Sequence, residues 1–481
     1  MVYDVLIVGA GVIGGMLARE LSKYRLSVCL LEKENDVACG ASRANSGIIH
    51  GGYDPEPGTL KAKLNVEGVD LLFQAAEELH VTVKNNGSMV CAFSAEENRH
   101  LQMLYDRGQK NGVPGLMLLS GDEARELEPA LSDEITMVLR VTNAGIVCPY
   151  ELTIAAIGNA MDNGVELKRE FSVARISKNG QGFTVTSEAG ECVQGKFLVN
   201  CAGGYADKIA AIAGDAAFSI IPRAGEYMLL DKNEGSTVKH TLFQVPTAAG
   251  KGILVSPTVD GNLLLGPTAT CVASPESRDT TPEGLSTVCS LAAKTVPSVN
   301  FRQAITSFTG VRATGDEGEF VIKASEIVPG LIHAGAIDSP GLTCCVSIAK
   351  YLVDILAEQG LQMENKENWC GQRQDPHAFR KMSLEEKNAF IKENPAYGKI
   401  ICRCEEVTEG EILAAIRNNP PARDLDGIKR RTRSGMGRCQ GGFCVPYVME
   451  LLAKEMGIPM ENVTKSGSGS YMVTGKIGEE V

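Results

Sequence analysis

Hydrophobic and polar positions at the start of the chain predict a strand, a helix and a second strand. Residues 3–10 (YDVLIVGA) are a short apolar run typical of a buried strand. Residues 12–23 repeat apolar positions with helical spacing, and residues 27–32 form a second apolar run. This βαβ order predicts an α/β fold that opens with a Rossmann-type parallel sheet covered by helices.

The later patterns predict a second, β-rich region and a separate C-terminal part. Residues 165–200 and 218–268 carry short strand patterns between turn signals. After residue 360 the composition becomes polar, which is typical of a connector. The sequence thus predicts α+β architecture overall, with these further elements: helices at 62–82, 94–111 and 342–359, a Gly/Ser-rich loop at 40–52, a strand at 331–336, and a charged helix within 360–395.

Composition narrows the class of protein. The 481 residues are 44% hydrophobic and 22% charged, as in ordinary globular proteins, and the net charge of −12 disfavours nucleic-acid binding. Most of the fifteen cysteines lie in apolar surroundings, so we expect reduced thiols and a cytoplasmic protein. We expect no signal peptide, because the first strand begins within a few residues of Met1, and no transmembrane span.

A glycine-rich turn follows the first predicted strand and predicts a dinucleotide site. Gly9 permits a tight turn, Gly11 lets the backbone approach a pyrophosphate, and Gly14 allows the helix to pack closely on the strand. The pyrophosphate would then lie at the helix N-terminus, where free N–H groups favour an anion. Glu32 ends the second strand and is placed to accept hydrogen bonds from a ribose, which disfavours NADP.

The identity of the dinucleotide follows less directly. The chain has no second GxGxxG and no CxxC redox motif, so a single dinucleotide and an organic reductant are expected. These residues alone leave both FAD and NAD open. Flanking motifs favour FAD, because the segment GASRANSGIIHGGYDPEPGTLKAK and the later NCAGGYADKIA, PRAGEY, SPTVDGNLLLGPTA, FTGVRAT and AGAIDSPGLT resemble the D-amino-acid-oxidase-like flavoprotein superfamily. Within it the chain is similar to the branch of FAD-dependent glycerol-3-phosphate and L-2-hydroxyglutarate dehydrogenases.

The resemblance implies which residues contact FAD. It places three groups of residues along the cofactor: Ala41, Ser42, Gly47 and Ile48 at the pyrophosphate, ribityl and ring; Val173, Ala202 and Gly203 at the adenosine half; and Gly335, Ser339, Gly341, Leu342 and Thr343 at the ribityl chain and flavin edge. A glycine-rich turn of this kind offers backbone N–H groups to the flavin O2 and N1, where negative charge develops on reduction.

The chain is accordingly expected to divide into discontinuous domains. The predicted division is: residues 1–85, 146–212 and 320–360 for the FAD-binding domain, 86–145 and 213–319 for an inserted substrate domain, 361–395 for the connector, 396–460 for a small helical module, and 461–481 for a flexible or surface-docked tail.

Four cysteines in the C-terminal module predict a metal site. Cys402 and Cys404 precede a helix predicted by the Thr408–Glu411 capping box, and Cys439 and Cys444 lie in a glycine-rich loop before another helix. Four thiolates can ligate a [2Fe–2S] cluster or zinc, although the C-x-C and C-x4-C spacings count against zinc. The segments CRCEEVTEGEI and RRTRSGMGRCQGGFC resemble bacterioferritin-associated-ferredoxin-like [2Fe–2S] domains, as at the end of anaerobic glycerol-3-phosphate dehydrogenase large subunits.

The basic run at 429–433 is interpreted as a solvated helix face, with docking of a partner or compensation of cluster charge as the alternatives. Elsewhere, His240 and His333 lie in strand-like settings and are expected to be structural.

Oxidation of an anionic secondary alcohol needs an anion anchor and a base near the flavin. Arg312 is the first choice of anchor, because arginine binds carboxylate or phosphate with two parallel hydrogen bonds. Arg223 is the second choice, with pairing to Glu226 as its structural alternative, and Lys251 is a weaker one. His50 is the candidate base, with a contact to the flavin ring or substrate, or a packed loop histidine, as the alternatives. Tyr227 could hydrogen-bond the substrate.

The resemblance of the C-terminal module implies sn-glycerol 3-phosphate as the substrate, which would be oxidised to dihydroxyacetone phosphate by hydride transfer to flavin N5. Electrons would leave through the cluster to a partner subunit or carrier, with membrane association only through that partner. Three rivals remain: L-2-hydroxyglutarate or another 2-hydroxy acid as substrate, amine oxidation, and an electron-transfer subunit with an inert flavin site.

Overall fold

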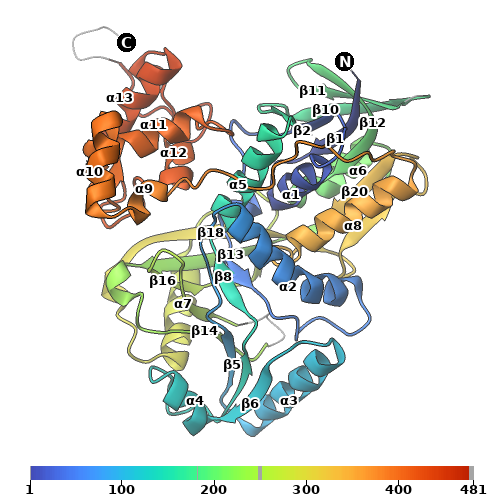
Figure 1. Ribbon diagram of the computed structural model, residues 1–481. Helices are drawn as coiled ribbons and strands as arrows, with labels where there is room; N and C mark the ends of the chain where they lie inside the picture. The colour runs from blue at the N-terminus through green and yellow to red at the C-terminus, as the bar shows by residue number, and fades with distance from the viewer. Residues whose placement is uncertain (1, 181, 247–251, 476–481) are drawn as a thin grey trace.

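The computed structural model describes residues 2–180, 182–246 and 252–475. The chain forms an α/β domain, a β-rich domain and a helical C-terminal module, which Figure 1 shows at the upper right, the bottom and the upper left. The segment after α8 crosses the α/β domain to reach the C-terminal module.

The α/β domain is built on an eight-stranded sheet with the path β10-β11-β12-β1-β2-β9, and β20 and β19 attached through β12. Parallel pairing places Leu6 between Cys29 and Leu198, as the βαβ pattern predicts. The strands of this sheet are β1 (Val2–Val8), β2 (Val28–Leu31), β9 (Glu166–Lys168), β10 (Val173–Asn179), β11 (Gly182–Ser187), β12 (Cys192–Asn200), β19 (Val321–Ala324) and β20 (Leu331–Gly335).

Helices cover this sheet because their apolar faces need burial. Helix α1 packs against α5 and α8, and α2 against α8, around one apolar core. The helices of this domain are α1 (Val12–Leu21), α2 (Leu60–Glu78), α5 (Pro149–Asp162), α6 (Ala206–Ile212) and α8 (Cys345–Glu358). Helix α8 begins later than predicted, because the residues from Pro340 to Cys344 form turns.

The β-rich domain combines strands from both predicted parts of the substrate domain. Its sheet has the path β17-β13-β16-β15-β14-β5-β7-β6, and β18 pairs along β13. Its elements are β5 (Ser88–Ala92), β6 (Leu116–Ser120), β7 (Met137–Val141), β13 (Ile220–Leu230), β14 (Thr241–Gln244), β15 (Leu254–Pro257), β16 (Leu263–Gly266), β17 (Thr270–Cys271), β18 (Ala304–Gly315), α3 (Ala95–Lys110), α4 (Gly121–Leu127) and α7 (Pro282–Thr295), with the 3-10 turns η3 (Lys232–Glu234) and η4 (Phe301–Gln303).

A three-stranded sheet lies between the two domains. Its strands are β3 (Ile48–Ile49), β8 (Gly145–Val147) and β4 (Val83–Lys84). The predicted loop at 40–52 therefore contains a short strand as well as the 3-10 turn η1 (Ala41–Arg43), because Ile48 and Ile49 pair with Ile146 and Gly145.

The C-terminal module has its own apolar core, to which Ile412, Ile428 and Leu452 belong. Its elements and those of the connector are α9 (Ala378–Lys381), α10 (Leu384–Glu393), η5 (Pro395–Gly398), β21 (Ile400–Cys402), β22 (Val407–Thr408), α11 (Glu409–Arg417), α12 (Leu425–Thr432), α13 (Val445–Met456) and η6 (Met460–Asn462). The described part of the tail is docked, since Gly467 N donates to Asp424 Oδ2 at 3.0 Å.

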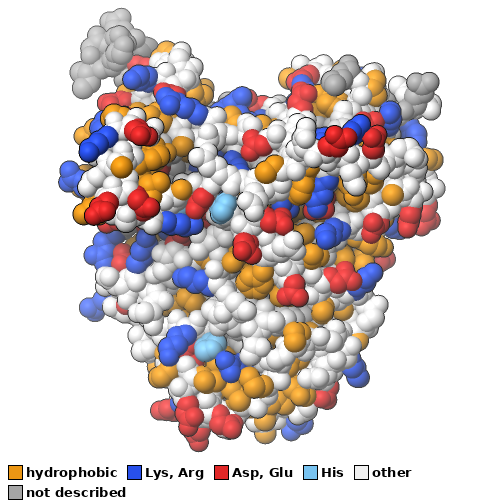
Figure 2. Space-filling view, viewed as in Figure 1, with side chains coloured by type: hydrophobic (Ala, Val, Ile, Leu, Met, Phe, Trp, Pro, Cys, Tyr) orange, Lys and Arg blue, Asp and Glu red, His pale blue; other side chains and the backbone are white. Residues whose placement is uncertain are grey.

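Acidic and basic side chains are interspersed over the face seen in Figure 2, without a broad patch of one sign. Within residues 2–180, 182–246 and 252–475, no helix combines the length and apolar character needed to span a membrane.

Candidate flavin cavity and four-thiol site

The glycine turn after β1 is fixed by backbone contacts. Gly9 has φ +106°, and a Cβ there would lie 2.4 Å from the carbonyl oxygen of Cys201. A Cβ on Gly14 would lie 2.0 Å from the carbonyl oxygen of Gly9, so α1 and β1 approach too closely for any side chain. Val12 N donates to Ser42 Oγ at 2.9 Å, which joins the start of α1 to the η1 loop.

Glu32 lies at the end of β2 and is almost fully buried. Its two carboxylate oxygens accept hydrogen bonds from Ala10 N at 2.8 Å and Glu34 N at 3.0 Å. Burial outweighs these bonds and raises the pKa of Glu32 to about 7. The carboxyl also lines the cavity described next, where a ribose can reach its remaining lone pairs.

A cavity of about 1340 Å³ extends from the glycine turn to the β-rich domain. It exceeds the volume usual for one small ligand, so it has room for a dinucleotide and a substrate. The predicted site residues that line it are Gly9, Gly11, Glu32, Ala41, Ser42, Gly47, Ile48, His50, Val173, Ala202, Gly203, Tyr227, Arg312, Ser339, Gly341 and Leu342.

Four predicted residues lie outside this lining. Gly14 packs under the turn, and Gly335 lies against Phe218, whose ring a Cβ would meet at 2.7 Å. Thr343 is fully buried behind His50, and Arg223 lies on β13 opposite Arg312 of β18. Lys251 lies outside the described residues.

His50 is held from three sides. Its backbone N donates to Thr343 Oγ1 at 2.9 Å, and its carbonyl oxygen accepts from Asn65 Nδ2 at 2.7 Å. The imidazole Nε2 lies 3.3 Å from Ser339 Oγ, and the ring lies 5.8 Å from that of Phe243. Thr343 therefore positions the histidine while Ser339 contacts it inside the cavity.

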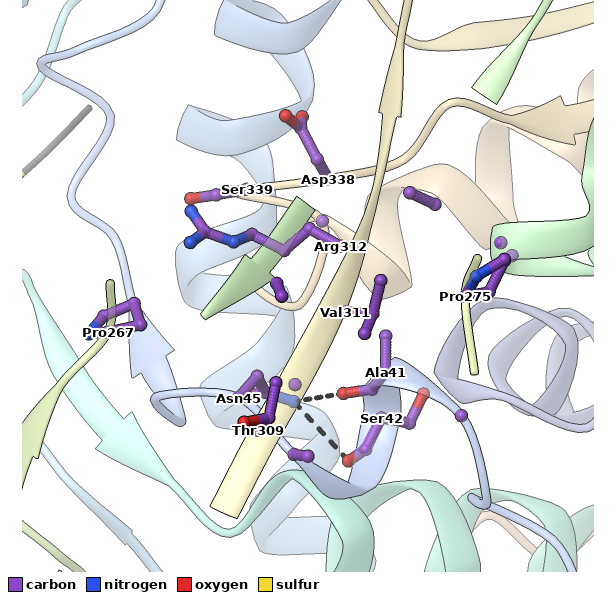
Figure 3. Close-up of a pocket in the computed structure, with 18 of the residues that line it drawn as sticks. Ala41, Ser42, Asn45, Pro267, Pro275, Thr309, Val311, Arg312, Asp338 and Ser339 are labelled. Carbon is purple, nitrogen blue, oxygen red and sulfur yellow. Dashed lines mark hydrogen bonds between the residues drawn. The ribbon is translucent and has the colours of Figure 1, made fainter. Parts of the chain in front are cut away.

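Strands β13 and β18 form the opposite wall. The guanidinium of Arg312 donates to Thr268 O at 2.8 Å, and its side chain extends from β18 into the cavity (Figure 3). Tyr227 Oη lies 3.1 Å from Ser46 Oγ, and burial raises the pKa of Tyr227. The carboxylate of Glu226, the suggested partner of Arg223, accepts hydrogen bonds from Thr281.

Two cavity arginines were not predicted from the sequence. Arg43 belongs to the η1 loop beside Ala41 and Ser42, a loop closed by Asn45 Nδ2, which donates to Ala41 O at 3.0 Å (Figure 3). Arg278 comes from the loop after β17. Burial of Arg43 and, to a smaller extent, the positive charge of Arg278 lower the pKa of Arg43. The position of Arg43 in the Gly/Ser-rich loop could have indicated that it lines the cavity, whereas no sequence feature near Arg278 indicated this.

The two histidines expected to be structural have buried partners. His333 Nε2 lies 3.0 Å from Asp215 Oδ2 in the core of the α/β domain. His240 Nδ1 lies 3.0 Å from a carboxylate oxygen of Glu128. Neither histidine lines the cavity.

The four cysteines of the C-terminal module meet as two pairs. The predicted capping box of Thr408 and Glu411 starts α11 behind them. Cys404 Sγ and Cys439 Sγ lie 3.6 Å apart, and a side-chain hydrogen bond joins Cys402 to Cys444. Two sulfurs bonded at about 2.3 Å to one tetrahedral metal are about 3.8 Å apart, so the Cys404–Cys439 pair fits one metal ion.

The donors around these thiols also fit a cluster. The bond from Cys444, with N–H groups of Gly435 and Glu405, lowers the pKa of Cys402 to about 5. Burial raises the pKa of Cys439, but the side-chain hydrogen bond with Cys404 and the backbone N–H groups of the glycine-rich loop outweigh it, and the pKa is lowered. Because each pair offers two thiols, the arrangement suits a two-iron cluster held by four cysteines.

The basic run at 429–433 is not a solvated helix face, and that expectation was wrong. Arg430 and Arg431 bind the fully buried carboxylate of Asp36, at 2.5 Å and 2.7 Å. Arg433 binds Asp260 at 2.5 Å and Glu405 at 2.9 Å. The run therefore docks the C-terminal module onto the other two domains of the same chain, because it faces their buried acids.

A further contact connects the two sites. Tyr150 Oη lies 3.4 Å from Met436 Sδ. On the cavity side, Tyr150 follows Pro149, whose ring lies beside Gly47 of the cavity wall. On the thiol side, Met436 precedes Gly437, which lies so close to Cys404 that a Cβ on the glycine would be 2.3 Å from Cys404 Cβ. Neighbouring residues thus link the cavity wall to the thiol loop through the Tyr150–Met436 contact.

Comparison with known proteins gives the same two parts. Residues 4–355 match the FAD dependent oxidoreductase (DAO) family, and residues 400–454 match the BFD-like [2Fe-2S] binding domain.

Individual relatives extend the comparison over the full chain. A glycerol 3-phosphate dehydrogenase of Caloramator mitchellensis is 45% identical over 479 residues, covering 100% of both chains. A glycerol 3-phosphate oxidase of Mycoplasma genitalium is 33% identical over 76% of this chain and 97% of its own. The structure of dithionite-reduced L-alpha-glycerophosphate oxidase from Mycoplasma pneumoniae with FAD bound superposes with a TM-score of 0.74, at 32% identity over 78% of this chain and 98% of that chain.

The match over most of the chain, with the glycine turn and the cavity that opens from it, shows that the protein belongs to the FAD dependent oxidoreductase family and carries a C-terminal [2Fe–2S] domain.

Proposed function

We propose that this protein is a dehydrogenase that oxidises sn-glycerol 3-phosphate to dihydroxyacetone phosphate. The observation that carries the proposal is that His50 and Arg312 line one cavity with the glycine turn. A proton acceptor and an anion anchor are the two groups that a phosphorylated secondary alcohol requires. The relatives named as glycerol 3-phosphate enzymes support this substrate over a 2-hydroxy acid.

Bound FAD would supply the ring that accepts a hydride. His50 would take the hydroxyl proton at Nε2, the atom that contacts Ser339, so both side chains would orient the substrate hydroxyl. Arg312 would hold the phosphate with its guanidinium, which already donates to Thr268 O and is therefore fixed in direction. Gly341 and Leu342 line the cavity with backbone groups that can face the flavin edge.

Electrons would leave through the cluster to a partner subunit or carrier, because an enzyme that gave two electrons directly to oxygen would not need a one-electron centre. The contact of Tyr150 with Met436 supports a short route between the cavity and the thiol loop. We also propose a cytoplasmic location, in keeping with the fifteen free thiols.

The test is anaerobic bleaching of the bound flavin by candidate substrates. We expect sn-glycerol 3-phosphate to bleach the yellow colour, while sn-glycerol 1-phosphate, L-2-hydroxyglutarate and sarcosine do not. Bleaching by L-2-hydroxyglutarate alone would identify a 2-hydroxy-acid dehydrogenase. No bleaching by any substrate, with FAD bound, would favour an electron-transfer subunit.

Variants assign the roles of the two residues. His50→Asn should slow bleaching by about 10²- to 10⁴-fold, as expected for loss of a general base. Arg312→Gln should weaken substrate binding by about 10-fold or more, because a charged hydrogen bond is lost. His80→Asn is the matched control, since His80 is exposed at φ +55°, a conformation that asparagine tolerates. Equal effects of His50→Asn and His80→Asn would contradict the role of His50.

A further inference from the structure

The four-thiol site has one buried and one exposed side. Cys402 and Cys444 are each 2% exposed within the module, whereas Cys404 lies at the surface and Cys439 is half-buried. A cluster held by these thiols would therefore come closest to solvent at Cys404 and Cys439. Because electron transfer weakens steeply with distance, an acceptor has to approach this side.

Exposed aromatic residues lie next to these thiols. Phe443, adjacent to Cys444, is 80% exposed, and Tyr447 in the first turn of α13 is 53% exposed. Large aromatic side chains are costly to leave in water and are enriched in the centres of protein interfaces. Among the described residues, neither ring belongs to the apolar core of the module. The rings are therefore available to a partner.

Two exposed arginines flank the same side. Arg403 stands between Cys402 and Cys404, and it makes no ion pair with any residue that the structure describes. Arg438 precedes Cys439 and stays 62% exposed although its guanidinium reaches Asp231. Arg403 and Arg438 each adjoin a thiol in sequence, and the guanidinium of Arg438 also donates to Gln303 Oε1 at 3.0 Å. The exposed acids nearby in sequence are Glu406, two residues after Cys404, and Glu450 on α13. The positive charge next to the thiols therefore comes from Arg403 and from the exposed side of Arg438. Local positive charge of this kind selects an acidic partner.

We propose that the surface formed by Arg403, Arg438, Phe443 and Tyr447 is the docking site of an acidic protein that carries one electron. This inference deepens the proposed function and rests on its electron exit. One electron passes from the reduced cluster to the oxidised cofactor of the carrier, so two dockings remove the two electrons of one substrate oxidation. The apolar rings form the centre of the contact, and the arginines orient the carrier.

The experiment uses the full holoprotein, reduced photochemically, so that its outcome does not depend on the substrate. Oxidised plastocyanin with an acidic face is the probe, and oxidised cytochrome c with a basic face is the opposite-charge comparison. We expect plastocyanin to be reduced faster than cytochrome c at low salt, with a rate that falls at least about 10-fold between 10 and 200 mM salt. A faster reaction with cytochrome c would overturn the acidic partner.

Substitutions locate the surface. Arg403→Glu and Phe443→Ser should each lower the plastocyanin reduction rate, and its affinity by calorimetric titration, at least about 10-fold, with the visible spectrum of the cluster unchanged. Arg99→Glu and Leu384→Ser are the matched controls, because Arg99 is exposed on α3 and Leu384 is 75% exposed on α10. Equal rates in all four variants would overturn the proposal. A dimer that Phe443→Ser abolishes would show that a second copy of the chain occupies the surface instead.

Discussion

The flavin cavity and the four-thiol site are built in opposite ways. The cavity gathers residues from Val8 to Leu342 and depends on glycines and backbone groups that let chain segments approach closely. The four thiols come from two neighbouring loops and depend on side chains and on N–H groups next to them in sequence. The first site therefore needs a whole domain to exist, whereas the second needs only its own small module.

The junction of the two regions differs from both. The apolar cores of the α/β domain and the C-terminal module share no residue, and charged contacts join them. Asp36 is fully buried between Arg430 and Arg431, and Arg169 lies 3.8 Å away. Buried ion pairs add little net stability but define one geometry, because each charge is costly without its partner. The junction thus fixes the position of the cluster relative to the cavity.

The largest effect is expected at this junction. Asp36→Asn would leave arginine charges buried without their anion and should cost about 3–5 kcal/mol, measured as urea unfolding followed by cluster absorbance and flavin fluorescence. Glu364→Gln is the control, because it breaks an exposed pair with Arg25 and should cost under about 1 kcal/mol. Similar losses of stability for both variants would show that the buried ion pairs of Asp36 do not hold the junction together.

The next effect separates the flavin cavity from the thiol site. Gly14→Ala would place Cβ 2.0 Å from Gly9 O, which should cost about 3 kcal/mol and remove FAD while iron stays bound. Gly180→Ala, with nothing within 4 Å of its Cβ, should keep both. The flavin-to-iron ratio of the purified proteins is the measurement, and a yellow Gly14→Ala protein would contradict this role of the glycine.

The buried carboxyl of Glu32 should give the flavin region its own pH dependence. The pKa of Glu32 is raised from 4.5 to about 7, so the folded, flavin-free protein binds more protons than the unfolded chain within this window. Its stability should therefore fall as pH rises from 4.5 to 7, by up to about 3 kcal/mol. Glu32→Gln cannot titrate and should flatten this part of the curve, measured by urea unfolding at several pH values. Parallel curves for the two proteins would refute the assignment.

The smallest effect tests the local construction of the thiol module. Thr408→Ala removes the buried capping box of α11 and should cost about 1 kcal/mol in the unfolding of this module. Ser383→Ala removes the exposed capping box of α10 and is the matched control. It should leave the cluster absorbance transition in place. If Ser383→Ala shifted that transition and Thr408→Ala did not, the connector, and not the module, would limit the stability of the thiol site.

The sequence by itself determined the features that depend on near neighbours. The turn at Gly9 and Gly14, the strand that ends at Glu32 and the capping box at Thr408 follow from local backbone geometry. The two cysteine loops are equally local, because Cys402 lies close to Cys404 in sequence and Cys439 lies close to Cys444.

Only the tertiary structure decided the contacts between distant segments. It brought Ser339 to His50, placed Arg278 over the cavity, put Arg312 rather than Arg223 in its lining, and buried Arg430 against Asp36. A pattern of residues reports which side chains seek burial or charge, but it does not report which partner they meet, because that depends on how whole domains pack. For this reason the short motifs, and the resemblance they carry, indicated the cofactor types and the residues Arg312 and Tyr227 of the cavity wall, whereas Arg278 and the junction were not predictable.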